Sequence, residues 1–406
     1  MQARFIVLAS LILGWAGHGA AQDRLVAQGY DHFYNLEYDQ AIADFKTNIA
    51  QRPDDPSAWN HLAHAILYRA MYRSGALESQ LVTGSNPFLR RDKVKTTSDE
   101  DQEFYNVINK SIGLCRAKLG ANPDAADTFR AMGVAYGLRA NYNFLVRKSW
   151  TDALHDASRA NDVVRKAIRL EPSDVDARLI PGVYDYVAGS LPWGYRFLSF
   201  LAGFHGNRER GMHTLETVAR EGTTDNVDAQ ILLIAIYRRE KRPAEALPLL
   251  NDLIPRYPRN HLLRFEVVQM YSDLGDRDNA MREIDHIWML HREGAPGYAD
   301  LMSEKIDYLE GNFLFWYNDL DRAEAHLKKV TAKAGSLDLN TAIMAWMRLG
   351  QTYDLEGQRK VAVAAYREAV AMAPNSEVGK ESQRYIGRPY KRAQPAVAAE
   401  SAQARN

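Results

Sequence analysis

The chain has 406 residues, of which 46% are hydrophobic and 10% aromatic, so it can bury a large core and is too apolar for a disordered chain. Lys and Arg together number 51, as do Asp and Glu. The resulting formal charge of zero argues against a generic nucleic-acid binder and against a polybasic membrane-surface protein, because both are usually strongly basic. A single cysteine excludes an internal disulfide framework.

The first 21 residues have the pattern of a cleavable signal peptide. Arg4 provides the positive start, residues 5–16 the apolar core, and Gly19, Ala20 and Ala21 the small residues before the cleavage site. The apolar core is shorter than the roughly 20 residues that span a bilayer, so an uncleaved anchor is the less favoured alternative. We expect cleavage after Ala21 and export to the periplasm or the extracellular space.

Export would place the only thiol, that of Cys115, in an oxidising compartment. Cys115 falls on an apolar helix face of the repeat pattern described below. We therefore expect a small buried hydrophobic residue, with an intermolecular disulfide as the alternative.

The stretch 342–374 carries a two-helix pattern. Four residues recur at i, i+3, i+4 and i+7, on one face of a helix: Trp346, Leu349, Gly350 and Tyr353. Three more recur at i, i+4 and i+7 of a second helix: Ala362, Tyr366 and Ala369. The small residues let the two backbones approach closely, and the aromatic rings fill the remaining space. Pro374 lacks a backbone N–H and restricts the residue before it, so it separates one hairpin from the next.

This stretch resembles the tetratricopeptide-repeat family, whose 34-residue pattern is W-x2-L-G-x2-Y, then A-x3-F, then A and P. The same phase recurs in seven units upstream, the first of which has Gly29, Ala41, Phe45 and Pro53. From Pro53 to Pro123 is 70 residues, one repeat plus 36, and from Pro123 to Pro172 is 49, one repeat plus 15. The array is therefore interrupted by insertions, which we expect mainly between the two helices of a repeat.

The resemblance implies an all-α fold, a right-handed α-solenoid of about eight helix hairpins that covers residues 22–387. We place its insertions at about 70–104, 137–150 and 187–205. Residues 376–386 look like a solvating cap helix. The tail, 388–406, has no periodicity, and we expect it to be disordered.

The middle of the chain has a second, finer resemblance. Residues 183–192 lead to the apolar run 197–204 and then to the element Gly203-Phe204-His205-Gly206-Asn207-Arg208-Glu209-Arg210-Gly211. Over about 40 residues this resembles the inclusion-body-clearance, or domain-39 tetratricopeptide, family, with its S-L-L-P turn, apolar helix and G-F-x-G-[DN]-R-E-x-G element. The resemblance implies a binding scaffold, one member acting in lipid-droplet and aggregate handling. Those proteins are intracellular, whereas this chain carries an export signal, so only the fold is transferred. We expect Asn207 to cap a helix.

No phosphate loop, dinucleotide fingerprint, nucleophile elbow or metalloprotease motif occurs in the sequence. His61 and His64, at i and i+3, are able to share a metal ion with His32, but no carboxylate accompanies them at a supporting spacing. We expect surface or groove histidines there. The sequence thus predicts no catalytic residue, no metal and no cofactor, and favours a non-enzymatic protein.

In the family that the repeats resemble, the first helices line the concave side of the solenoid. When each residue is placed at its position in the repeat, the positions that face the groove are occupied by eight candidates: Asn60, His64, Arg130, Arg238, Phe265, Gln269, Met347 and Gln351. This mixture of aromatic, Met, Arg and amide groups suits an extended or helical peptide. The alternative is that half of them only pack against inserted helices. The family's two-carboxylate clamp of Lys, Asn and Arg is not found here.

We therefore expect an exported, non-enzymatic scaffold that binds a protein or peptide partner in its concave groove, and no nucleic acid. The alternative is a membrane-peripheral assembly or lipid-handling factor that uses the apolar segment 191–204. Asp185, Pro192 and Arg196, with two glycines, argue against a membrane-spanning helix in residues 183–204. Membrane contact is possible but not favoured. An enzyme built from the insertions is the least favoured hypothesis. The sequence specifies neither the partner nor the oligomeric state.

Overall fold

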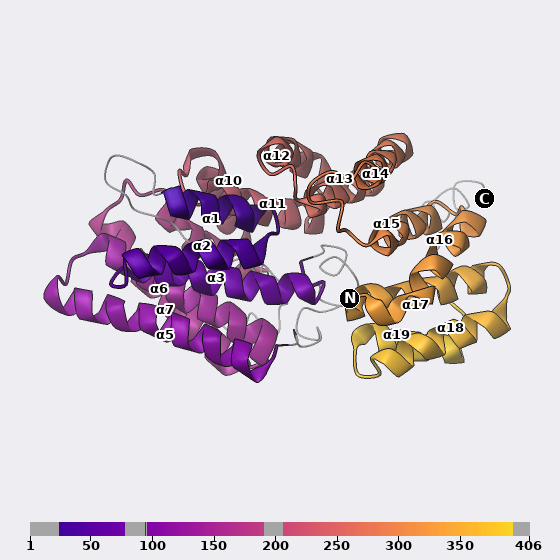
Figure 1. Ribbon diagram of the computed structural model, residues 1–406, viewed down its shortest axis with the longest axis horizontal. Coiled ribbons are helices and arrows are strands. Elements are labelled where there is room, and N and C mark those ends of the chain that lie inside the picture. The colour runs from indigo at the N-terminus through magenta and orange to yellow at the C-terminus, as the bar shows by residue number, and fades with distance from the viewer. Residues whose placement is uncertain (1–23, 78–93, 95, 191–205, 393–406) are drawn as a thin grey trace, which may run out of the picture. The chain divides into compact units, whose positions relative to one another are not determined.

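The computed structural model describes residues 24–77, 94, 96–190 and 206–392 (Figure 1). Within these ranges the chain forms 17 α-helices, three short helical turns and no strand, which confirms the predicted all-α fold. The predicted signal peptide, the apolar segment 191–204 and residues 393–406 lie outside the described residues.

Eight helix hairpins account for nearly all of the described chain. The chain divides into two compact units, residues 1–301 (unit 1) and 302–406 (unit 2), and each is described by itself. In unit 1 the paired helices are α1 (Arg24–Tyr34) with α2 (Tyr38–Gln51), α3 (Pro56–Arg73) with α5 (Ser98–Ala121), α6 (Ala126–Tyr142) with α7 (Trp150–Leu170), α8 (Leu179–Gly189) with α10 (Arg208–Glu221), α11 (Asn226–Arg239) with α12 (Pro243–Arg256), and α13 (His261–Leu274) with α14 (Arg277–Arg292).

In unit 2, α15 (Ser303–Trp316) pairs with α16 (Leu320–Ala332), and α17 (Leu339–Leu355) pairs with α18 (Arg359–Met372). The last helix, α19 (Glu377–Gly387), packs on α18 at the position predicted for the cap helix. We predicted a disordered tail from residue 388 onward, but its first residues, 388–392, are ordered. The backbone N–H of Tyr390 donates to Asp354 Oδ2 at 2.7 Å, and its ring lies 5.4 Å from that of Tyr385. Residues 388–392 therefore pack on unit 2.

In the first and the last hairpin, a glycine of the first helix admits a larger side chain from the second helix. A Cβ atom added to Gly29 would lie 2.4 Å from the ring of Phe45, and one added to Gly350 would lie 2.5 Å from the ring of Tyr366. Real Cβ atoms do not approach other atoms this closely, so only glycine allows these interhelical distances. The packing predicted for the first and last units is confirmed.

The insertion predicted at 137–150 is helical. α6 continues to Tyr142, a π-helix follows at Asn143–Arg147, and α7 runs for 21 residues from Trp150. The added residues thus lengthen both helices of the third hairpin. The other short turns are 3₁₀-helices at Asp176–Arg178 and Ala334–Ser336.

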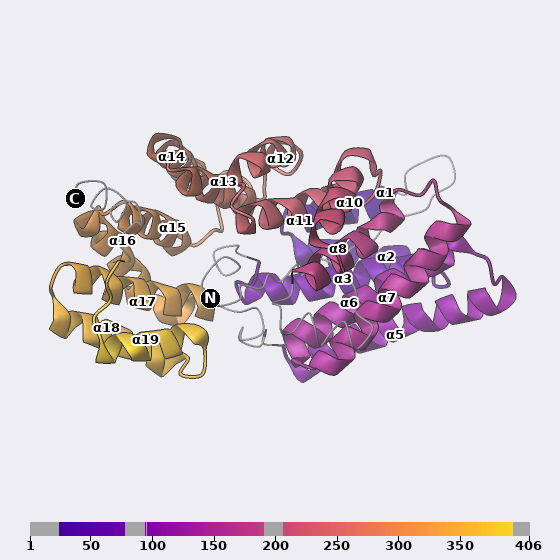
Figure 2. The same ribbon diagram turned by 180° about the vertical axis from the view of Figure 1, so that it is seen from behind.

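In unit 1 the first hairpin contacts the segment between α12 and α13, so the first five hairpins form a closed turn. The Arg259 guanidinium donates to Asp31 at 2.6 Å and to Glu37 at 2.9 Å, and Asn260 Nδ2 donates to the backbone oxygen of Tyr34 at 2.7 Å. These contacts join residues more than 220 positions apart in the sequence. Figure 2 shows the same unit from behind.

The glycine contacts can be tested in unit 1 with a matched pair of substitutions. A Cβ at Gly133 in α6 would lie 2.1 Å from Val164 Cγ2, whereas a Cβ at Gly113 in α5 would meet nothing within 4 Å. Gly133→Ala should lower the free energy of unfolding by roughly 1–3 kcal/mol, because α6 and α7 must separate. Gly113→Ala should be neutral or stabilise by about 0.5–1 kcal/mol, because alanine favours helix. Equal stability of the two variants in urea unfolding would contradict this packing.

In unit 2 a buried row of carboxylates fixes α16 on α15. Glu304, Asp307 and Glu310 have side chains no more than 8% exposed. Four cationic side chains of the next helix and its end pair with them: Arg322, His326, Lys329 and Lys333. The His326 ring lies 2.7 Å from Asp307 and 3.3 Å from Glu310. Burial alone would lower the pKa of His326, but these two carboxylates outweigh burial and raise it to about 9.

A raised histidine pKa makes stability depend on pH. The stabilisation from His326 is fully present below pH 6.5, its ordinary pKa, and is lost as pH rises through about 9. Over this pH interval we expect the free energy of unfolding of the wild type to fall by about 1–2 kcal/mol more than that of His326→Gln. The difference is this small because solvent screens the partly exposed ring. Chemical unfolding at pH 6, 8 and 10 measures it. His213→Gln, whose ring is 79% exposed, is the control and should follow wild type; parallel curves for all three would contradict the proposed pairing.

Candidate functional site

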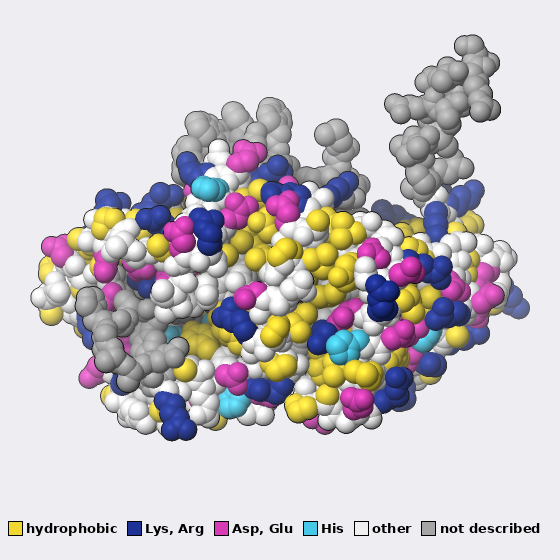
Figure 3. All heavy atoms as spheres, turned by 90° about the horizontal axis from the view of Figure 1, so that it is seen from above, with side chains coloured by type: hydrophobic (Ala, Val, Ile, Leu, Met, Phe, Trp, Pro, Cys, Tyr) yellow, Lys and Arg dark blue, Asp and Glu magenta, His cyan; other side chains and the backbone are white. Residues whose placement is uncertain are grey.

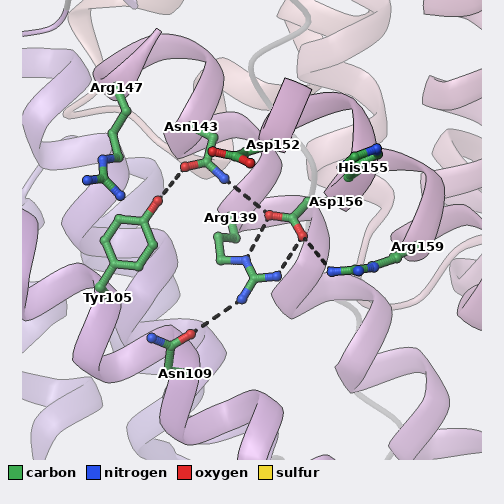
Figure 4. A pocket seen from close by; sticks show the side chains of 9 residues that line it. All are labelled: Tyr105, Asn109, Arg139, Asn143, Arg147, Asp152, His155, Asp156 and Arg159. Atoms are coloured by element: carbon green, nitrogen blue, oxygen red, sulfur yellow. Dashed lines mark hydrogen bonds and ion pairs between the residues drawn. The ribbon is translucent and has the colours of Figure 1, made fainter. Parts of the chain in front are cut away.

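An open polar cleft of about 410 Å³ lies in unit 1 between α5, α6 and α7 (Figure 4). Two of its lining residues come from α5, three from α6 and the π-helix, and four from α7. In that order they are Tyr105, Asn109, Arg139, Asn143, Arg147, Asp152, His155, Asp156 and Arg159. All nine side chains are polar or aromatic, so the cleft suits a charged or hydrogen-bonding ligand.

The π-helix shapes one wall of this cleft. Its i→i+5 bonding widens the turn, and Arg139, Asn143 and Arg147 all line the cleft despite the change of helix type. Lys148 ends the π-helix in the left-handed region with φ of 56°, and the Ser149 N–H donates to the backbone oxygen of Asn143 at 2.9 Å. Single π-turns and left-handed non-glycine residues are costly and are enriched at functional sites.

The floor of the cleft is a closed hydrogen-bonded chain. The Asp156 side chain is only 5% exposed and accepts from Arg139 Nη2 at 2.6 Å, from Arg139 Nε at 2.8 Å and from Asn143 Nδ2 at 3.2 Å. Tyr105 donates its hydroxyl hydrogen to Asn143 Oδ1. The hydrogen bond to Asp156 raises the pKa of Arg139, so the pair stays ionised and mutually neutralised.

The rim of the cleft is exposed and carries more cationic than anionic groups. The Arg147 guanidinium lies 4.8 Å from the centre of the Tyr105 ring. Arg159 has a side chain 60% exposed, and its nearest guanidinium nitrogen is 3.9 Å from Asp156. His155 is exposed beside them, and Asp152 accepts a hydrogen bond from Ser149 at 2.5 Å. The cleft thus offers a rigid neutral floor and a charged rim.

Three of the predicted groove residues lie in the interior of unit 1. Asn60 and His64 have no exposed surface, and Arg130 is 4% exposed. Asn60 donates to the backbone oxygen of Ala131 at 2.8 Å, and the His64 ring lies 4.4 Å from that of Phe33. Arg130 is held by two carboxylates, those of Asp174 and Asp225. These contacts within unit 1 bury the three residues, so they do not line an open groove.

The other five candidates are also covered. The Arg238 side chain is 7% exposed and donates to Gln269 at 2.9 Å and to Asp273 at 2.8 Å. The remaining three, Phe265, Met347 and Gln351, are at most 5% exposed. The structure brings Arg238 and Gln269 together across α11 and α13. A role of these five in partner binding stays a prediction.

The sequence predicts that His61 and His64 are surface or groove histidines and not metal ligands. The predicted surface position is wrong. His61 and His64 are both buried, and burial lowers the pKa of each to about 3, so both rings are neutral. His32 pairs instead with Asp44, and its Nδ1 lies 2.9 Å from Asp44 Oδ2. In the part of the chain that the structure describes, no three His, Cys, Asp or Glu residues are grouped to hold a metal ion.

Two further predictions are confirmed. Cys115 is fully buried, and burial raises the pKa of its thiol to about 12. Asn207 caps α10, accepting from the Arg210 N–H at 2.8 Å.

The cleft was not predicted from the sequence, although the spacing of its polar residues indicates it. Arg139, Asn143 and Arg147 repeat at intervals of four residues within the predicted insertion, and Asp152, Asp156 and Arg159 continue at intervals of four and three. Polar residues at helical spacing in an insertion indicate a helix face that is solvated or binds a ligand. Two such faces on consecutive helices predict a polar cleft between them.

On the face in Figure 3, acidic and basic side chains are interspersed, in line with the neutral composition. No described helix has both the length and the apolar character that crossing a bilayer requires.

The fold and the cleft define a helical-repeat protein with a polar surface site. Family models described as tetratricopeptide repeat match residues 26–69 and 345–376. Together with the helix hairpins, these two matches show that the chain contains tetratricopeptide repeats. The finer resemblance to the inclusion-body-clearance family stays a prediction. No curated protein matches the chain.

Several solved structures are similar to this chain. A thermophilic tetratricopeptide-repeat protein of Thermus thermophilus is 18% identical with a TM-score of 0.34, covering 63% of this chain and 99% of its own. The human IFIT1 dimer with m7Gppp-AAAA is 12% identical with a TM-score of 0.46, covering 90% and 81%. Yeast Tom70 is 13% identical with a TM-score of 0.38, covering 94% and 96%. Likeness at this level says nothing about a shared ligand.

Proposed function

We propose that the chain is an exported, non-enzymatic interaction scaffold that binds a segment of a partner protein at the cleft of the third hairpin. Tetratricopeptide repeats generally serve as protein-interaction scaffolds. The observation that carries the proposal is the contrast between two surfaces: the rim of the cleft is exposed, while the predicted groove residues are covered.

The construction of the cleft supports binding. Its floor needs no partner, because Arg139, Asn143 and Asp156 satisfy one another. A ligand therefore need not break internal hydrogen bonds, and little side-chain entropy is lost in the floor. Arg and Tyr are enriched among residues that dominate binding energy, and Tyr105, Arg147 and Arg159 supply both types.

A site-specific crosslinking experiment tests the location of the contact. A photo-crosslinking amino acid is placed at His155 on the rim, or at Leu170, which is 39% exposed on the same helix but does not line the cleft. In living cells we expect a discrete crosslinked protein at position 155 and none at position 170. Equal products at both positions, or none at position 155, would contradict the proposed location.

Export is proposed on the pattern of residues 1–21. The intact mass of the protein recovered from its own cells should correspond to a chain that begins at Gln22. An envelope fraction should contain this species. A full-length mass in the cytoplasmic fraction would exclude export and would leave the crosslinking result to be judged separately.

A further inference from the structure

We propose that the cleft recognises side-chain carboxylates of an acidic peptide segment, with Arg147 and Arg159 as the groups that bind them. The inference rests on the proposed function and names the chemistry of the partner segment.

The charge balance of the cleft favours an anionic ligand. Asp156 is already matched by Arg139 through two hydrogen bonds, of 2.6 and 2.8 Å, so this pair adds no net charge to the site. What remains on the rim is two guanidinium groups, those of Arg147 and Arg159, against the carboxylate of Asp152. An anion therefore gains attraction there, and a cation would be repelled.

Arg147 is positioned but not neutralised. Its guanidinium lies over the Tyr105 ring at 4.8 Å, a cation–π contact that restrains the side chain while leaving its charge in place. Among the described residues, Asp101 is the carboxylate whose charge acts on Arg147, and the two do not form a salt bridge. Tyr105 is itself fixed by its hydrogen bond to Asn143, so the donors of Arg147 are held at the rim.

Arg159 differs from Arg147 because it has an ion pair, but that pair is loose. Its contact with Asp156 is 3.9 Å, too long for a hydrogen bond, and the Asp156 oxygens are already occupied by Arg139 and Asn143. A guanidinium has five N–H donors arranged to bind a carboxylate through two parallel hydrogen bonds. In Figure 4 Arg147 and Arg159 lie on opposite sides of the cleft, which suits a segment with two acidic side chains.

The test is fluorescence anisotropy with the mature full chain and a fluorescein-labelled octaglutamate peptide. Arg147→Gln and Arg159→Gln should each weaken binding about tenfold, as expected for loss of a charged hydrogen-bonding partner. Arg169→Gln is the matched control, because it removes the same charge from an exposed position of α7 that does not line the cleft. Its effect should be less than twofold. Octalysine should not bind wild type at this site.

Three outcomes would overturn the inference. One is an equal loss of binding in Arg169→Gln, which would indicate diffuse charge attraction. The second is displacement of the peptide by inorganic phosphate at lower concentration than by glutarate, which would assign the site to phosphate. The third is unchanged binding in both rim variants. If His155 crosslinking persists in any of these cases, the proposed function stands and only the acidic ligand is excluded. Arg159→Glu gives a second check, because it should abolish octaglutamate binding and admit octalysine.

Discussion

The close approach of two helices over a glycine is the contact that fixes the first, the third and the last hairpin of this protein. Gly29 faces Phe45, and Gly350 faces Tyr366; in both pairs the two residues are 16 positions apart. A Cβ atom at either glycine would lie within 2.5 Å of the ring. The interhelical distance is thereby fixed, and so is the face that each hairpin offers to the next.

The third hairpin keeps this contact while accommodating additional residues. Gly133 meets Val164, 31 positions later, which is 16 plus the 15 residues of the insertion. Because the contact is preserved, the insertion can only extend the hairpin beyond it. The extension contains the π-helix and the first turns of α7, and these supply most of the cleft. The candidate site is thus an addition to a repeat whose packing is otherwise regular.

Local spacing predicted the helix pairs well, because each glycine and its partner side chain belong to one hairpin. It did not predict the burial of the groove candidates, because burial depends on contacts between distant parts of unit 1. Nothing in the repeat pattern indicates that Arg259 binds Asp31 and Glu37, more than 220 residues away, or that Arg130 binds Asp225, 95 residues away. The π-helix was missed for another reason: one extra residue in a turn leaves no periodic signal.

The central claim is that a partner meets the extended third hairpin and not the covered interior of unit 1. Hydrogen–deuterium exchange of the mature chain, with and without the protein captured by crosslinking, tests this most directly. The account predicts slower exchange in residues 105–109 and 139–159 on binding, with residues 60–64 and 130 unchanged. Slower or faster exchange confined to the interior residues would contradict it, because the partner would then act on the closed turn itself.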